Sequence, residues 1–219
     1  MEGNETISGY AYSHGELNES HGYLLPAVRQ VLSQRRSVSR RQRVFDLGCG
    51  NGSVAAAIAE MGFDVWGVDP SVEGIRQAAA HHPYVKLELG SAYDDLAARY
   101  GQFSFVISLE VVEHVYNPRK FAATAYSLLE NNGWAIISTP YHGYWKNLAL
   151  AMTGKMDSHF TALWDHGHIK FWSMRTLSTL LREAGFGNVS FLRVGRIPPL
   201  AKSLIAVAQR SKEAEDTSI

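Results

Sequence analysis

Short apolar segments alternate with helix-like segments over residues 43–138, and this alternation constrains the fold more than any other feature of the sequence. The expected strands are brief apolar runs bounded by turn residues, at residues 44–47, 65–68, 85–89, 103–108 and 134–138. The expected helices lie between them, at residues 53–61, 71–81, 94–100 and 118–129. Strands that alternate with helices form parallel crossovers, and near-continuously apolar strands are covered on both faces. The pattern therefore predicts an α/β fold with a doubly wound parallel sheet.

Two further strands follow a helix that we expect from Ser173 to about Ala184. They are predicted at residues 189–194 and 203–208, with a short turn around Pro198 between them. Because this turn is too short for a crossover helix, the two strands must pair in antiparallel fashion at the edge of the sheet. The complete prediction is a doubly wound, mostly parallel seven-stranded sheet with an antiparallel edge strand, which is a Rossmann-like arrangement.

The chain of 219 residues has the length of one domain with a single core. We assign residues 43–210 to this domain and residues 211–219 to a flexible tail. Residues 1–42 are expected to form an irregular arm, a helix from His21 to about Ser33, and a linker rich in arginine. We interpret the linker as solvated. A phosphate-binding patch is the other interpretation, and the formal net charge of zero disfavours it.

The single cysteine and the polar N-terminal segment exclude several classes of protein. One cysteine forms no internal disulfide, which argues against a small secreted module. The segment MEGNETISGY is acidic and polar, whereas a signal peptide is basic and then apolar. No run of about 18 apolar residues occurs. We therefore expect a cytoplasmic protein without a membrane-spanning helix.

The segment from Pro140 to Trp172 fits neither the strand pattern nor the helix pattern. It contains four of the nine histidines and a series of aromatic residues. A connection of this length within a compact domain is usually functional or disordered. We interpret it as a lid insertion, at about residues 140–172, that covers an apolar substrate.

A glycine-rich turn joins the first expected strand to the helix that follows it. It contains Gly48, Gly50 and Gly52, which let the chain turn sharply and leave room for a ligand at the carboxyl end of the sheet. The second strand ends in Asp69, 21 residues after Gly48. That is about the offset at which an acid meets the ribose of a bound nucleotide. The order of strand, turn, helix, strand and acid predicts a site for a nucleoside-containing ligand.

This turn does not fit a dinucleotide. The dinucleotide fingerprint requires glycine or alanine at position 53, where the chain has Ser53, and this disfavours a nicotinamide oxidoreductase. Asp46 lies at the mouth of the turn, where its charge would repel a pyrophosphate and attract an ammonium or sulfonium group. S-adenosylmethionine carries both of these cations and no phosphate.

The segments VFDLGCGNG and VWGVDPS resemble the first two motifs of class I S-adenosylmethionine-dependent methyltransferases, and the similarity extends from about Arg43 to Ala208. The resemblance implies the Rossmann-like fold of that family, with S-adenosyl-L-methionine as the cofactor. ELGSAYD resembles the third motif, although Ser91 stands where the family commonly has an acid that contacts adenine. The cofactor-binding residues that the resemblance implies are Asp46, Gly48, Gly50, Gly52, Asp69, Pro70, Ser91, Ala92 and Leu109.

Two acids and a histidine follow the fourth strand. If the chain turns helically there, Glu110 shares one face with Glu113 and His114. This arrangement resembles that of ubiquinone-pathway O-methyltransferases and of small-RNA 2′-O-methyltransferases, in which such residues ligate a metal. The resemblance implies Mg²⁺ or Mn²⁺ held by Glu110, Glu113, His114 and His168, with His166 as the alternative to His168. Two other interpretations stay open, namely His114 as a catalytic proton acceptor without a metal, and a structural role.

The function that the resemblance implies is transfer of a methyl group to a hydroxyl oxygen of a small aromatic or lipid-like acceptor. An RNA ribose 2′-O-methyltransferase is one alternative. No basic domain accompanies the linker, however, so we expect a small-molecule partner rather than a nucleic acid. A non-catalytic S-adenosylmethionine-binding module is the other alternative, because an intact cofactor site does not establish turnover.

Overall fold

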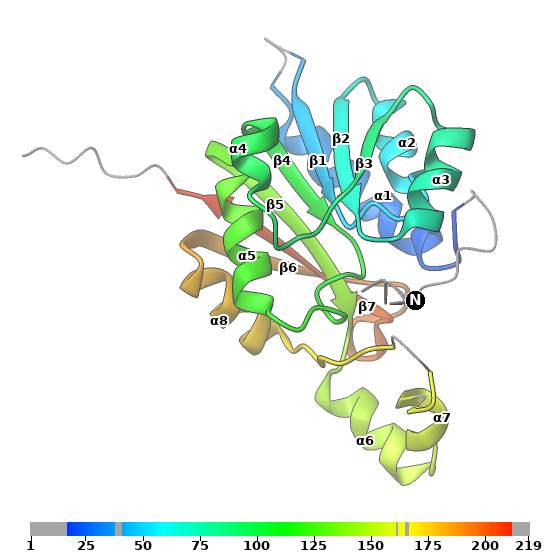
Figure 1. The fold of residues 1–219 in the computed structure, drawn as a ribbon. Coiled ribbons are helices and arrows are strands. Elements are labelled where there is room, and N and C mark those ends of the chain that lie inside the picture. Colours follow the sequence, from blue (N-terminus) through cyan, green and yellow to red (C-terminus); the bar gives the residue numbers. More distant parts are fainter. Residues whose placement is uncertain (1–16, 38–40, 161, 165–166, 212–219) are drawn as a thin grey trace, which may run out of the picture.

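The computed structural model describes residues 17–37, 41–160, 162–164 and 167–211. Within these ranges seven strands form one mixed sheet in the order β3-β2-β1-β4-β5-β7-β6 (Figure 1). Strands β1 to β5 run parallel, as the alternation predicts. The strands are β1 (Arg43–Leu47), β2 (Asp64–Asp69), β3 (Lys86–Leu89), β4 (Phe103–Ser108), β5 (Leu129–Pro140), β6 (Phe186–Val194) and β7 (Ser203–Arg210).

Helices cover both faces of this sheet (Figure 1). Apolar side chains alternate along β4, so that Val106 packs in the hydrophobic cluster on one face of the sheet, and Phe105 and Ile107 pack in the cluster on the other face. A strand that is buried on both faces belongs at the centre of a sheet. One face carries α1 (His21–Arg35), α2 (Ser53–Ala59) and α3 (Val72–His81), and the other carries α4 (Leu96–Tyr100), α5 (Pro118–Ser127) and α8 (Met174–Glu183).

Strand β7 runs antiparallel to both of its neighbours, β5 and β6. The turn before it contains only the short helix η1 (Pro198–Leu200), which leaves no room for a crossover. The predicted antiparallel pairing at this edge is confirmed, and β7, the strand next to the outermost one, is the strand whose direction is reversed. Strand β5 is longer than predicted, because Leu129 already pairs with Phe103 before a shift in register.

The arginine-rich linker is only partly solvated where the structure describes it, because Arg36 and Arg41 are exposed and other arginines are packed. The guanidinium group of Arg35 lies 4.2 Å from the centroid of the Trp134 ring, and that of Arg43 lies 4.0 Å from the centroid of Phe103. Planar guanidinium groups stack well on aromatic rings, so these side chains are used in packing and the prediction of a solvated linker is wrong for them. Residues 38–40, most of the N-terminal arm and the tail lie outside the described residues.

The predicted lid insertion contains two short helices, α6 (Tyr144–Met152) and α7 (Met156–Phe160), which we call the outer helices. They project beyond the end of the sheet at which the parallel strands finish, and none of their residues is buried (Figure 1). Residues 167–172, the inner segment, return along the loop after β4, where the backbone N–H groups of Ile169 and Lys170 donate to the carbonyl oxygen of Glu113. Throughout the described ranges, no helix has the length and apolar character needed to cross a bilayer.

Candidate active site

A cavity of about 340 Å³ lies at the carboxyl ends of the central parallel strands, where open α/β sheets bind their ligands. The glycine-rich turn after β1, the end of β2 and the loop after β4 contribute to its lining. All but one of the predicted cofactor-binding residues line the cavity, namely Asp46, Gly48, Gly50, Asp69, Pro70, Ser91, Ala92 and Leu109.

The glycines of the turn have different surroundings. Gly48 has a φ of 89°, and a Cβ atom added there would lie 2.5 Å from Cγ2 of Val111. Gly52 is the residue outside the lining, because an added Cβ would meet Cδ1 of Leu87 at 2.7 Å and the helix α3 beyond it. Since L-residues rarely adopt such positive φ values, both positions require glycine. Gly48 shapes the cavity, whereas Gly52 lets α2 pack closely against its neighbours.

Asp46 places a carboxylate in this cavity without a compensating group. Its side chain belongs to a residue that is only 2% exposed, and its Oδ2 atom has no hydrogen-bond partner among the described residues. Burial, together with the nearby charge of Asp69, raises its pKa to about 8. A buried carboxylate without a partner is costly, so a cationic ligand is the group that would satisfy it.

Asp69 connects the turn after β1 to the end of β2. Its Oδ2 accepts a hydrogen bond of 2.9 Å from the N–H of Gly50, and its Oδ1 accepts one of 2.8 Å from the N–H of Ser71. Burial nevertheless raises its pKa. The N-cap of α3 is a different side chain, because the hydroxyl of Ser71 accepts the N–H of Gly74. Asp69 is therefore not a helix cap, and each of its oxygens retains a lone pair for a ligand hydroxyl.

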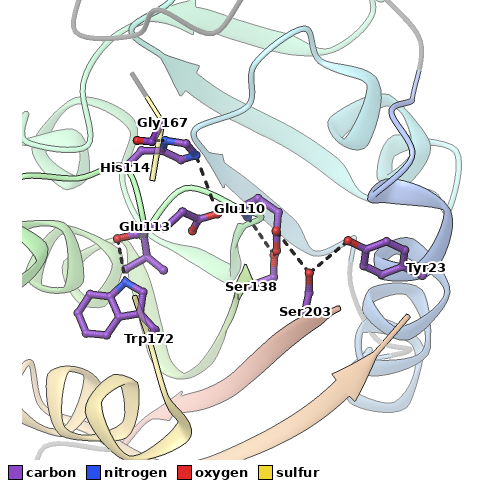
Figure 2. A network of polar contacts seen from close by, with 9 residues as sticks. Tyr23, Glu110, Glu113, His114, Ser138, Gly167, Trp172 and Ser203 are labelled. Atoms are coloured by element: carbon purple, nitrogen blue, oxygen red, sulfur yellow. Dashed lines mark hydrogen bonds and ion pairs between the residues drawn. The ribbon is translucent and has the colours of Figure 1, made fainter. Parts of the chain in front are cut away.

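The loop after β4 does not turn helically, and the predicted grouping of Glu110 with Glu113 and His114 is wrong. Glu110 has a φ of 56°, and its carboxylate lies beside Ser138 and Ser203 (Figure 2). Burial and the nearby charge of Glu110 raise the pKa of Glu113. The hydroxyl of Ser138 donates to Oε1 of Glu110 at 2.7 Å, and that of Ser203 lies 3.4 Å from Oε2. Burial raises the pKa of Glu110 to about 7. Two serines from strands distant in sequence thus hold this carboxylate.

Glu113, His114 and His168 do come together, with one potential ligand atom of each within 4.8 Å of the others. Both carboxylate oxygens of Glu113 are buried without a hydrogen-bond partner among the described residues. Nε2 of His114 lies 4.0 Å from Oε1 of Glu113, and Nδ1 lies 3.2 Å from the carbonyl oxygen of Gly167 (Figure 2). His166, the alternative ligand, lies outside the described residues.

Two parts of the cavity wall were not predicted. One part comes from residues at the start of α1, namely Asn18, Ser20 and His21. Asn and Ser are common just before a helix, so this pair is a sequence signal that could have predicted an ordered turn there. Tyr93 and Tyr116 add aromatic surface to that of Trp164, which belongs to the predicted lid insertion. The serines that hold Glu110 have no local sequence signal, because the fold alone brings them to that side chain.

Comparison with known proteins identifies the domain. Residues 18–190 match a family model described as a methyltransferase domain. A ubiquinone biosynthesis O-methyltransferase of a Caulobacter species is 40% identical over 116 residues, which cover 51% of this chain and 46% of that protein. The corresponding protein of Thiobacillus denitrificans is 34% identical over 149 residues, which cover 66% of this chain and 64% of that protein. The matched part thus spans about half to two thirds of the length of these relatives.

Among solved structures, the magnesium protoporphyrin IX methyltransferase of Synechocystis with bound S-adenosylhomocysteine has a TM-score of 0.61 and 21% identity, over 85% of this chain and 82% of that one. This likeness confirms the fold. With the family model covering most of the chain, and the glycine-rich turn and Asp69 in place around one cavity, the chain belongs to the methyltransferase-domain family.

Proposed function

We propose that this protein is an S-adenosylmethionine-dependent methyltransferase that transfers a methyl group to a hydroxyl oxygen of a small aromatic or lipid-like acceptor. The observation that carries the proposal is Asp46, a buried carboxylate without a partner at the glycine-rich turn of a methyltransferase domain. S-adenosylmethionine presents an ammonium and a sulfonium group, which are the cations that such a carboxylate favours. The curated relatives named as O-methyltransferases support oxygen as the accepting atom.

The residues around the cavity fit this cofactor. Asp46 and the backbone at Gly48 and Gly50 would hold the methionine part, and Asp69 would accept hydrogen bonds from the ribose hydroxyls. Pro70 and the backbone of Ser91 and Ala92 would form the walls around the adenine. When bound, the cofactor supplies an electrophilic methyl group on a positively charged sulfur. The protein must then align the acceptor oxygen with that methyl group and remove the hydroxyl proton.

His114 is suited to receive that proton. The carbonyl oxygen of Gly167 can only accept a hydrogen bond, so Nδ1 of the neutral ring carries the proton and Nε2 is the nitrogen of the ring that can take one up. His114 lines the cavity beside Leu109 and Val111. We therefore assign the catalytic role of proton acceptor to Nε2 of His114.

The alternative to His114 as a lone base is a divalent metal held by Glu113, His114 and His168, which when bound would lower the pKa of the acceptor hydroxyl. Both carboxylate oxygens of Glu113 are buried without a hydrogen-bond partner among the described residues, which supports this alternative. Without Glu110 the ligand set is one carboxylate and two imidazoles, which favours Mn²⁺ or Zn²⁺ over Mg²⁺. Burial and the neighbouring His114 lower the pKa of His168 to about 4, which keeps its imidazole in the neutral form that binds metals.

The acceptor end of the cavity favours an uncharged aromatic ring. The ring of Trp164 lies 6.2 Å from that of His114, and Tyr93, Tyr116, Val115 and Ile169 also line the cavity. The described lining contains no lysine or arginine, which argues against a phosphate-rich RNA acceptor. The arginines near residue 35 stack on aromatic rings instead.

Methyl transfer from labelled S-adenosylmethionine tests the proposal directly. Phenolic, quinol-like and lipid hydroxyl acceptors are compared with and without Mn²⁺, and the variant Asp46→Asn serves as the control for cofactor binding. Label in a hydroxyl acceptor supports the proposal. Tight binding of S-adenosylhomocysteine without any transfer would indicate a binding module, and label on RNA ribose would indicate the alternative acceptor class.

A further inference from the structure

The turn at residues 18–21, just before α1, forms part of the wall of the cavity. Its side chains Asn18, Ser20 and His21 all line the cavity. Oδ1 of Asn18 accepts hydrogen bonds from the N–H of Ser20, the hydroxyl of Ser20 and the N–H of His21, at 3.0, 2.7 and 3.1 Å. Nδ1 of His21 accepts the backbone N–H of Asn18 at 3.1 Å. The side-chain acceptor atoms of Asn18 and His21 are therefore already hydrogen-bonded within the turn.

The hydrogen-bonding groups that Asn18 and His21 can still offer to a ligand are all donors. The amide nitrogen of Asn18 keeps two protons and has no hydrogen-bond partner among the described residues. Because Nδ1 of His21 is an acceptor, the neutral ring carries its proton on Nε2. Burial lowers the pKa of His21 to about 4, so the ring stays neutral at pH 7. The backbone N–H groups of Ser20 and His21 are already bonded, so the side chains provide the free donors.

The turn leads into α1 on the Glu110 side of the sheet. The hydroxyl of Tyr23, two residues after the turn, lies 3.3 Å from the hydroxyl of Ser203, which itself lies 3.4 Å from Oε2 of Glu110 (Figure 2). Helix α1 also shares a hydrophobic cluster with α2, the helix that follows the glycine-rich turn. In the sheet order, Glu110 follows β4 and Ser91 follows β3, on opposite sides of β1. The turn is thus connected to the side of β1 opposite to the proposed adenine position at Ser91.

The charged side chains that line the cavity are acidic, so a carboxylate of a ligand needs neutral hydrogen-bond donors there. The described lining contains the acids Asp46, Asp69 and Glu110 and no lysine or arginine. Asp46 suits the cationic groups of the proposed cofactor, but the carboxylate of its methionine part needs hydrogen-bond donors. We infer that Asn18 and His21 form the receptor for this carboxylate, through Nδ2 and Nε2. The inference rests on the proposed function, because it assumes that S-adenosylmethionine is the ligand.

Two ligands that differ in the amino acid part test this inference. Calorimetry measures the Kd of S-adenosylhomocysteine, which has the carboxylate, and of 5′-methylthioadenosine, which has the same nucleoside and thioether without it. The variant Asn18→Asp keeps the acceptor oxygen that orders the turn and replaces the donors with negative charge. We expect it to weaken S-adenosylhomocysteine binding by about 10- to 100-fold and to change 5′-methylthioadenosine binding by less than about twofold. His21→Phe should weaken the first ligand selectively by roughly tenfold.

The matched control is Glu19→Gln, which changes a charge in the same turn at a residue outside the lining, and should leave both constants unchanged. Thermal unfolding establishes that each variant is folded. An equal loss for both ligands, or no loss in either variant, would overturn the inference, as would a wild-type protein that binds both ligands equally tightly. A wild-type protein that binds neither ligand would instead overturn the proposed function.

Discussion

Nδ1 of His114 lies 3.2 Å from the carbonyl oxygen of Gly167, a residue that belongs to the inner segment of the lid insertion. A carbonyl oxygen accepts hydrogen bonds and cannot donate, so this contact determines which nitrogen of the imidazole holds the proton. Nε2 is then the basic nitrogen of the ring, and it lies 4.0 Å from Oε1 of Glu113. The same geometry serves a proton acceptor and a metal ligand, and the two roles need separate tests.

His114→Ala should abolish most turnover under either mechanism. Removal of a positioned proton acceptor lowers kcat by about 10²- to 10⁴-fold. The Kd of S-adenosylhomocysteine should change by less than about twofold, because the imidazole acts on the acceptor hydroxyl. Steady-state methyl transfer and calorimetry measure the two quantities. Near-normal kcat in this variant would exclude His114 from catalysis.

His168→Ala distinguishes the metal from a lone base. If His168 is a ligand, the variant should lose at least about tenfold in turnover and recover part of it at millimolar Mn²⁺. Chelation of the wild-type protein should then slow methyl transfer while leaving the binding of S-adenosylhomocysteine unchanged. Turnover that is insensitive both to chelators and to the loss of His168 would identify His114 as a base that acts without a metal.

Asp46 makes cofactor binding depend on pH. Its pKa is about 8 in the free protein, so the side chain is protonated at lower pH and must lose that proton to pair with a cation. We expect the affinity for S-adenosylhomocysteine to fall by up to about tenfold per pH unit as the pH decreases from 8 to 6. Calorimetry in buffers of different ionisation enthalpy should detect the released proton. In Asp46→Asn both the proton release and this pH dependence should disappear.

The raised pKa of Asp46 also makes the stability of the ligand-free protein depend on pH. The pKa of Asp46 is about 8 in the folded state and about 3.8 for a free aspartate side chain, so between these pH values the folded protein holds a proton that the unfolded chain has lost. The free energy of unfolding therefore decreases as the pH rises from about 4 to about 8. Asp46→Asn, which carries no charge, should be more stable than the wild type at pH 8 by about 1 kcal/mol or more. Urea unfolding at pH 5 and pH 8 tests this difference.

Asp69→Ala should weaken S-adenosylhomocysteine binding by about 1–3 kcal/mol, through loss of charge-assisted hydrogen bonds to the ribose. It also removes two acceptors of backbone N–H groups, so Asp69→Asn is the milder companion variant. NADH is the control ligand. Tighter binding of NADH than of S-adenosylhomocysteine by the wild-type protein would contradict the cofactor assignment.

Hydrogen exchange should separate the outer helices from the inner segment. Helices α6 and α7 have no buried residues, so we expect their amides to exchange readily without acceptor and to be protected with it. The amides of Ile169 and Lys170 are bonded to Glu113 and should be protected in both states. Full protection of α6 in the ligand-free protein would contradict a lid that closes.

The sequence predicts the sheet well because each of its strands carries a local signal. Phe103–Ser108 is apolar apart from its two serines, and the structure buries all of its residues. The glycine-rich turn and Asp69 are equally local, and they meet in one cavity as expected. The position of Glu110 could not be predicted from its spacing, because its positive φ and the hydroxyls of Ser138 and Ser203 depend on strands that only the fold brings together.

The two parts of the lid insertion are attached to the domain differently: the inner segment is hydrogen-bonded to the loop after β4, whereas the outer helices are not buried. Residues 167–172 are bonded to the loop after β4, with the indole N–H of Trp172 donating to the carbonyl of Val112. His168 is thus held in place by the hydrogen bonds of the inner segment to the loop after β4, although in the sequence it follows the outer helices. The outer helices contribute no buried residue, so we expect substitutions there to cost the core little. If these helices close over the acceptor, residues 144–160 can be varied to alter acceptor preference while the reacting groups stay unchanged.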